Sequence, residues 1–282
     1  MATFFNQATL SYSGGTVNSN VTSGEIIEVL SANKTAVVDV YTQGSEVTYI
    51  INIVNSGNIP FTGLTITDDL GAYQFGTPQI TLQPLEYVDG SVKYFVNGVL
   101  QAPPTVTAGT PLVISGINVP ANGVVTVAYT AMANEFAPPI GTGFIENTAT
   151  ISGGGITEIT VNEQIGASTD PVLSISKSVT PTVVTENGQI TYTFVIQNSG
   201  NTEATAGDNI ALTDIFDPIL ENISVTLNGT PFTAYSYDEA TGVFTTNAGS
   251  ITVPAATFTQ NPTTGAYITD PGTAILTVTG TI

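Results

Sequence analysis

The sequence predicts an all-β protein with two tandem β-sandwich domains. Three observations predict this fold: short runs of alternating apolar and polar residues, turn residues about every ten positions, and an internal repeat along nearly the whole chain. Thr, Val, Ile, Gly, Ser and Asn dominate, and charged residues make up 9% of the 282 residues. This composition favours strands and turns over helices, and the length suits two domains.

The repeat is clearest in two segments that begin at Lys34 and Lys177. The first reads KTAVVDVYTQGSEVTYIINIVNSGN and the second reads KSVTPTVVTENGQITYTFVIQNSGN, and they align without a gap 143 positions apart. Further matches pair Thr67-Asp68 with Thr213-Asp214, Val96-Asn97-Gly98 with Leu227-Asn228-Gly229, residues 117–121 with 251–255, and residues 126–130 with 277–281. The Asn-Gly pairs predict two-residue hairpin turns, and each copy predicts one domain.

Alternation within the copies indicates the kind of sandwich. Residues 47–53 and 190–196 alternate strictly, as expected for strands with one buried face. Several such short strands per copy predict an immunoglobulin-like sandwich. We expect an N-terminal donor strand and linker at 1–24, a first sandwich at 25–165, and a second sandwich at 166–282.

The order of the motifs resembles a known bacterial repeat. Each copy has Lys, then a Thr-Tyr strand, then Asn-Ser-Gly, Thr-Asp and Asn-Gly, and the first copy ends in Asn147-Thr148-Ala149-Thr150. This pattern is similar to the "domain of unknown function eleven" family over nearly the whole chain. The resemblance implies tandem Ig-like modules of surface and spore proteins, and the paired arrangement resembles the appendage proteins of clostridial spores.

The two copies differ in their last strand. Residues 144–154 predict a final strand of the first sandwich, whereas the second copy has no such segment. The N-terminal segment supplies the match, because Asn6, Ala8 and Leu10 fall on Asn147, Ala149 and Ile151. Asn6 precedes Lys34 by 28 residues and Asn147 precedes Lys177 by 30. Residues 6–15 are therefore interpreted as the last strand of a preceding repeat.

A sandwich without its edge strand exposes unpaired backbone groups and an apolar groove. Donation of the strand with Asn6, Ala8 and Leu10 to a neighbouring copy would fill that groove and build a head-to-tail homopolymer. Two alternatives stay open at this point. The segment could fold back onto its own second domain, giving a closed monomer, or residues 1–30 could be a disordered tail.

The two lysines at matching repeat positions, Lys34 and Lys177, suggest a covalent crosslink. Alternation places Lys177 on one strand face with Ile175 and Val179, and an inward lysine must lose its charge or find a partner. Ig-like domains of Gram-positive pilins and adhesins resolve this with a self-formed Lys–Asn isopeptide bond, assisted by a buried acid. By that resemblance, Lys34 bonds Asn147 with Asp68 assisting.

The second predicted bond is intermolecular. It joins Lys177 to Asn6 of a neighbour, with Asp214 assisting. The simpler interpretation makes each lysine a surface residue that forms an ion pair with Asp68 or Asp214, a contact that contributes about 0–1 kcal/mol when exposed. Lys93 is expected to face solvent, and Asn55 and Asn198 are expected to shape turns.

The composition excludes several function classes. There are 22 acidic residues, three lysines, no His and no Cys, for a formal net charge of −19. This charge argues against nucleic acid and anionic membranes as partners, and the missing residue types argue against zinc sites and common catalytic pairs. We expect no cofactor and no metal site. The N-terminus lacks a signal-peptide pattern, so we expect synthesis in the cytosol and a final location at the spore surface or outside the cell.

Besides a structural fibre subunit, the sequence leaves an adhesin and an enzyme as alternatives. A monomeric surface adhesin could use loop tyrosines, for which the candidates are Tyr73, Tyr87, Tyr235, Tyr237 and Tyr267. A carboxylate hydrolase would need a facing pair of acids. Asp68 and Asp69 are adjacent on a predicted strand and so point to opposite faces, which argues against an enzyme.

Overall fold

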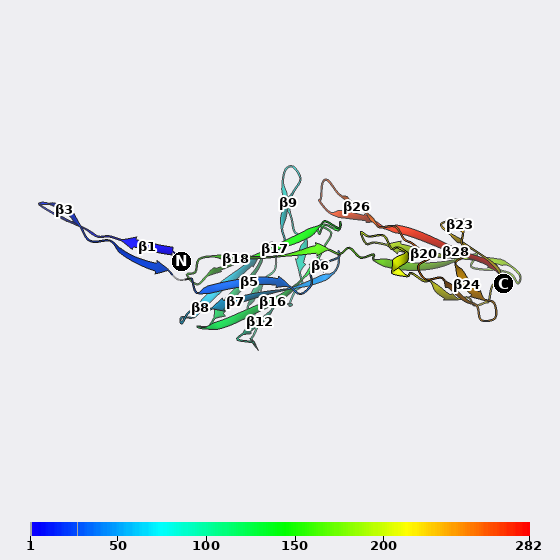
Figure 1. The fold of residues 1–282 in the computed structure, drawn as a ribbon, viewed down its shortest axis with the longest axis horizontal. Helices are drawn as coiled ribbons and strands as arrows, with labels where there is room; N and C mark the ends of the chain where they lie inside the picture. Colours follow the sequence, from blue (N-terminus) through cyan, green and yellow to red (C-terminus); the bar gives the residue numbers. More distant parts are fainter. Residues whose placement is uncertain (1, 27) are drawn as a thin grey trace.

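The computed structural model describes residues 2–26 and 28–282 of the chain. An N-terminal β-hairpin, a first sandwich and a second sandwich follow one another along a rod (Figure 1). Apart from a short 3-10 turn, η1 (Ala206–Asp208), the regular structure of the described residues is β-strand. The predicted all-β fold with two tandem immunoglobulin-like sandwiches is confirmed. No helix within the described ranges is long and apolar enough to cross a membrane.

The first sandwich packs two sheets around one apolar core. Sheet one has the order β13 (Val99–Leu100), β12 (Lys93–Val96), β16 (Gly123–Ala133), β7 (Glu46–Asn55) and β5 (Leu30–Ala36), with β11 (Leu85–Tyr87) also on β16. Sheet two has the order β14 (Thr105–Thr107), β15 (Leu112–Val119), β8 (Phe61–Asp68), β17 (Phe144–Gly153), β18 (Ile159–Ala167) and β6 (Val40–Tyr41). A side hairpin joins β9 (Tyr73–Phe75) to β10 (Ile80–Leu82). Alternating residues of β7 and β16 are fully buried, as their sequence pattern requires.

The second sandwich is smaller. Its larger sheet has the order β19 (Leu173–Thr180), β20 (Gln189–Asn198), β28 (Gly272–Thr281), β22 (Glu221–Leu227) and β23 (Thr230–Pro231). Its smaller sheet has the order β21 (Thr213–Ile215), β25 (Val243–Thr246) and β24 (Tyr235–Asp238), and β26 (Thr257–Gln260) pairs with β27 (Tyr267–Asp270).

The repeat predicted the strand correspondence. β5, β7, β8, β12 and β16 of the first sandwich match β19, β20, β21, β22 and β28 of the second. Asn97 and Gly98 have φ values of 50° and 78°, and Asn228 and Gly229 have 52° and 76°. Positive φ at both central residues is the requirement of a type I′ turn, so both predicted hairpin turns are confirmed.

The structure differs from the sequence prediction in the number of missing strands. β17 is not the final strand of the first sandwich, because β18 pairs with it from Phe144↔Gly166 to Ile151↔Ile159 and extends the domain to Ala167. Within the described residues the second sandwich has a counterpart of neither β17 nor β18. The repeat did not reveal β18, because the second copy has no segment that aligns with it.

The N-terminal segment also differs from the expected strand and linker. It is a hairpin in which β1 (Ala2–Asn6) pairs with β4 (Thr22–Ile26) and β2 (Thr9–Tyr12) pairs with β3 (Gly15–Asn18). The return strand satisfies backbone groups that a lone strand would leave open. The hairpin extends away from the first sandwich, at the opposite end of the rod from the second (Figure 1). In this structure the segment neither folds back onto its own second domain nor forms an irregular tail.

Candidate crosslinking sites

Lys34 lies in the middle of β5 and points into the core of the first sandwich. Its Nζ is 2.8 Å from Asp68 Oδ2, and the side chains of both residues have no exposed surface. Alternation along β5 leaves Ser31, Asn33 and Thr35 outside and turns Lys34 inward, so a charged group occupies a core position. Burial lowers the pKa of Lys34 from its usual 10.5, and the carboxylate of Asp68 partly offsets this.

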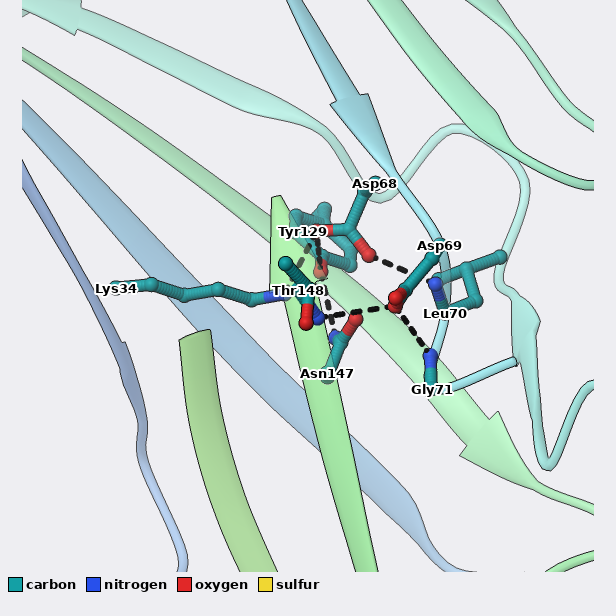
Figure 2. A network of polar contacts seen from close by, with 8 residues as sticks. All are labelled: Lys34, Asp68, Asp69, Leu70, Gly71, Tyr129, Asn147 and Thr148. Carbon is teal, nitrogen blue, oxygen red and sulfur yellow. Dashed lines mark hydrogen bonds and ion pairs between the residues drawn. The ribbon is translucent and has the colours of Figure 1, made fainter. Parts of the chain in front are cut away.

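A hydrogen-bonded chain links Lys34 to Asn147, the predicted reaction partner. The Tyr129 hydroxyl donates to Asp68 Oδ2 at 2.6 Å, and Asn147 Nδ2 donates to the same hydroxyl at 2.9 Å. Asp68 and Asn147 both have no exposed surface. Lys34, Asp68, Tyr129 and Asn147 lie on β5, β8, β16 and β17, and Figure 2 shows their side chains converging. The structure therefore brings together all three residues that the sequence assigned to the first site.

Neighbouring backbone groups fix the two carboxyl groups at the end of β8. Asp68 Oδ1 accepts from the Leu70 N–H at 3.0 Å. Asp69 points to a different side, where its Oδ1 accepts from the N–H groups of Gly71 and Thr148 at 2.8 and 2.9 Å. This second contact ties β8 to β17 directly beside Asn147 (Figure 2). The two adjacent acids do not face one another, as the strand geometry predicted.

Sequence reasoning missed Tyr129 and Tyr49. Their rings stack with centroids 5.6 Å apart, and Lys34 Nζ lies 4.9 Å from the Tyr49 centroid. Burial raises the pKa of Tyr129 well above its usual value of 10, so its hydroxyl remains a donor to Asp68. The signal in the sequence was the placement of both tyrosines at inward positions of strictly alternating strands.

Two buried polar atoms of this cluster have no hydrogen-bond partner among the described residues. They are the Tyr49 hydroxyl and Asn147 Oδ1. An unpaired buried acceptor costs about 1–3 kcal/mol, and such atoms need an explanation where they occur. Here both belong to the side chains around one buried amine, which marks the cluster as chemically unusual rather than as ordinary core.

Lys177 occupies the repeat position of Lys34 but is less buried. Lys177 forms an ion pair with Asp214, but the two side chains keep 40% and 19% of their surface exposed. Its Nζ lies 4.5 Å from the Tyr192 ring centroid and 5.5 Å from that of Phe216. Tyr129 lies opposite Tyr49 in the first sandwich, whereas Val278 lies opposite Tyr192 in the second, so the second site lacks that hydroxyl.

Asn6 is not near Lys177 within one chain. It lies exposed on β1 of the N-terminal hairpin, while Lys177 lies on β19 of the second sandwich, and the first sandwich separates them (Figure 1). Ala8 and Leu10 are likewise exposed. The structure thus brings Lys177 and Asp214 together and leaves the third predicted partner, Asn6, on a free arm.

The remaining sequence candidates have structural roles. Asn55 Oδ1 accepts from Gly57 N–H, and Asn198 Oδ1 accepts from Gly200 N–H, so both shape the predicted turns. Lys93 faces solvent. Three of the tyrosine candidates, Tyr87, Tyr235 and Tyr237, pack against the two cores.

Comparison with known proteins shows likeness in fold only. No protein-family model matches the chain, and no curated protein matches its sequence. Among solved structures, the pilus backbone protein of Streptococcus pneumoniae is 13% identical at a TM-score of 0.36, covering 86% of this chain and 55% of its own length. The major pilin subunit of Bacillus cereus is 13% identical at a TM-score of 0.35, with coverages of 96% and 73%. The collagen-binding subdomain of the Enterococcus faecalis surface protein ACE is 10% identical at 0.32, with coverages of 51% and 99%.

Proposed function

We propose that this chain is the structural subunit of an extracellular or spore-surface fibre. Subunits join head to tail when the N-terminal segment of one copy completes the second sandwich of the next. An isopeptide bond between Lys34 and Asn147 crosslinks each subunit internally, and a bond between Lys177 and Asn6 joins neighbouring subunits. The observation that carries the proposal is the free N-terminal segment, whose Asn6, Ala8 and Leu10 match the buried residues of β17.

The first site supports a bond-forming step within the subunit. The neutral Lys34 amine attacks Cγ of Asn147, the Nζ–Cγ bond forms, and the Cγ–Nδ2 bond breaks. Nδ2 leaves as ammonia and takes one proton from Nζ, so atoms balance and nothing is oxidised or reduced. The lowered pKa of Lys34 favours the nucleophilic form of its amine. Asp68 is hydrogen-bonded to both Lys34 and Tyr129, and Tyr129 to the departing nitrogen, which gives the proton a path.

The chain connection supports donation between copies rather than within one. Only residues 27–29 lie between β4 and β5, and this connection spans at most about 14 Å. A ten-residue strand such as β7 is about 33 Å long, which is more than this connection spans, so the base of the paired hairpin stays at the end of the first sandwich that faces away from the second. A neighbouring copy has no such restriction. A head-to-tail contact of this kind generates a linear polymer unless it closes into a ring.

Net charge places a condition on assembly. Copies with a formal charge of −19 repel one another, so their association must rest on apolar burial and backbone pairing. Covalent bonds between subunits would then make the assembly independent of salt once it has formed.

Electron microscopy and boiled SDS gels of the recombinant full chain test this function. We expect fibres at neutral pH, a ladder of bands after boiling, and a crosslinked peptide that contains Asn6 and Lys177. Cleavage after acidic residues suits this chain, since it has three lysines for trypsin but 22 acidic residues. Asn6→Ala should remove the ladder, whereas Asn20→Ala, on the same arm, should keep it. A soluble monomer with both peptides unlinked would overturn the proposal and favour the monomeric adhesin.

A further inference from the structure

We propose that the donated element is the whole N-terminal hairpin, Ala2–Ile26, which docks as a preformed two-stranded unit into the second sandwich of a second copy. Its outgoing strand would extend the sheet at β21, and its return strand would cover β19. This inference rests on the proposed function and specifies its interface.

The hairpin has the dimensions of the β17–β18 hairpin in the first sandwich. Asn147 pairs with Glu163 and Asn6 pairs with Thr22, a separation of 16 residues in both cases. Ile145 pairs with Ile165 and Phe4 pairs with Gly24, a separation of 20 residues in both. The free arm therefore reproduces both strands of the pair that completes the first sandwich, and not the outgoing strand alone.

Side-chain sizes on the inward face agree with this correspondence. In the first sandwich, Ile145 and Ile165 are both buried in the core. On the arm, a Cβ added to Gly24 would lie 2.5 Å from the Phe4 ring, which shows that the ring packs directly over the glycine. A large and a small residue thus take the places of two isoleucines, and the Phe4 ring lies over both positions. Phe4 is 53% and Leu10 65% exposed, so the arm presents apolar residues without a core to receive them.

The second sandwich has an open position for each strand of the hairpin. β8 pairs with β15 on one side and β17 on the other, whereas β21 pairs only with β25 among the described strands. In the first sandwich β18 lies against β5, and the inward residues Leu30 and Ala32 are partly buried. Their counterparts on β19, Leu173 and Ile175, are 41% and 60% exposed. A single strand at β21 would leave Ile175 uncovered, and the return strand of a hairpin would cover it.

The repeat also fixes the register of docking. Ala149 lies opposite Asp68 and Thr150 opposite Thr67 in the first sandwich. By correspondence, Ala8 lies opposite Asp214 and Thr9 opposite Thr213 of the neighbour. This register turns Asn6 inward at the repeat position of Asn147, toward Lys177. Docking would then bury Lys177, which is 40% exposed in the free chain, as fully as Lys34 is buried.

Thiol protection in fibres tests the return strand directly, because the chain has no cysteine of its own. Ile175→Cys reports on the covered face, and Val99→Cys, on the edge strand β13, is a matched control at 62% exposure. We expect maleimide to label Val99→Cys fibres fully and Ile175→Cys fibres at least tenfold more slowly. Equal labelling of the two variants in intact fibres overturns the hairpin inference and leaves the fibre function standing. Absence of fibres from the unsubstituted chain overturns both.

An engineered disulfide tests the register if Ile175→Cys itself impairs assembly. Thr9→Cys and Thr213→Cys are introduced into separate chains that also carry Lys177→Arg, which removes the reactive amine. Mixing under oxidising conditions should give a dimer band that reductant reverses, since directly opposite residues suit disulfide geometry. Ser11→Cys, two positions further along the arm, should give little dimer with Thr213→Cys. Equal yields from both pairs contradict the docking register.

Discussion

Lys34 Nζ lies 2.8 Å from Asp68 Oδ2 with both side chains fully enclosed in the first sandwich. The repeat-related pair Lys177 and Asp214 is in contact but partly open to solvent. The difference follows from one feature of the fold. β17 and β18 cover the first pair, and the described part of the chain has no strand that covers the second.

The first prediction concerns the bond within the subunit. Purified protein should be lighter than its sequence mass by one ammonia for the Lys34–Asn147 bond, and Asn147→Ala should not lose this ammonia. By analogy with a disulfide that closes a loop of this size, the variant should lose about 5 kcal/mol of unfolding free energy. Intact mass and thermal unfolding measure the two effects. Asn162→Ala, an exposed asparagine on β18, is the control and should retain the bond.

The second prediction concerns the hydroxyl of Tyr129. Tyr129→Phe keeps the ring beside Tyr49 but removes the group that bridges Asp68 and Asn147. Because positioned proton transfer contributes about 10²–10⁴ in rate, freshly folded protein should accumulate the bond at least tenfold more slowly. A time course of intact mass measures this. Tyr41→Phe, whose hydroxyl bonds to the Pro138 carbonyl, should react at the normal rate. Equal rates for both variants would show that the hydroxyl takes no part.

The third prediction separates covalent from non-covalent assembly. Lys177→Arg retains a cation beside Asp214 but cannot form the isopeptide bond. Its fibres should form, be visible by electron microscopy, and dissociate to monomers in hot SDS. Lys93→Arg, a solvent-facing substitution, should leave the SDS-resistant ladder unchanged. A ladder that persists in Lys177→Arg would place the link at another residue.

The fourth prediction is a pH dependence in Asn147→Ala, where the Lys34 amine stays free. The folded pKa of Lys34 lies below 10.5, so between these two values the unfolded chain binds more protons than the folded chain. The unfolding free energy should therefore rise with pH through this window. Measurements should stay below pH 10, because the raised pKa of Tyr129 makes stability fall above it. Denaturant titrations of Asn147→Ala and Lys34→Met/Asn147→Ala compare the slopes, and the double variant should lose the dependence.

Much of the fold followed from the sequence because its signals are local. Alternation along residues 47–53 and 190–196 assigned buried faces, and the Asn-Gly pairs assigned the turns, since both depend on neighbouring residues only. The repeat made Lys34 and Lys177 equivalent, and the resemblance to isopeptide-forming Ig-like domains assigned Asp68 and Asn147 to the first of them. These predictions needed no knowledge of how the sheets pack.

Tertiary structure decided what surrounds each lysine and how many strands are missing. Tyr129 meets Asp68 only because β16 and β8 lie in facing sheets, a relationship that no local pattern encodes. The return strand of the N-terminal arm and its equivalence to β18 became visible only through pairing register, since the two segments share little sequence. The sequence by itself determined the two-sandwich fold and the hairpin turns, and with the resemblance it indicated Lys34, Asp68 and Asn147 but neither Tyr129 nor β18. Lys34 is enclosed and Lys177 is partly exposed. This difference depends on contacts between strands that are distant in the sequence, so only the folded chain shows it.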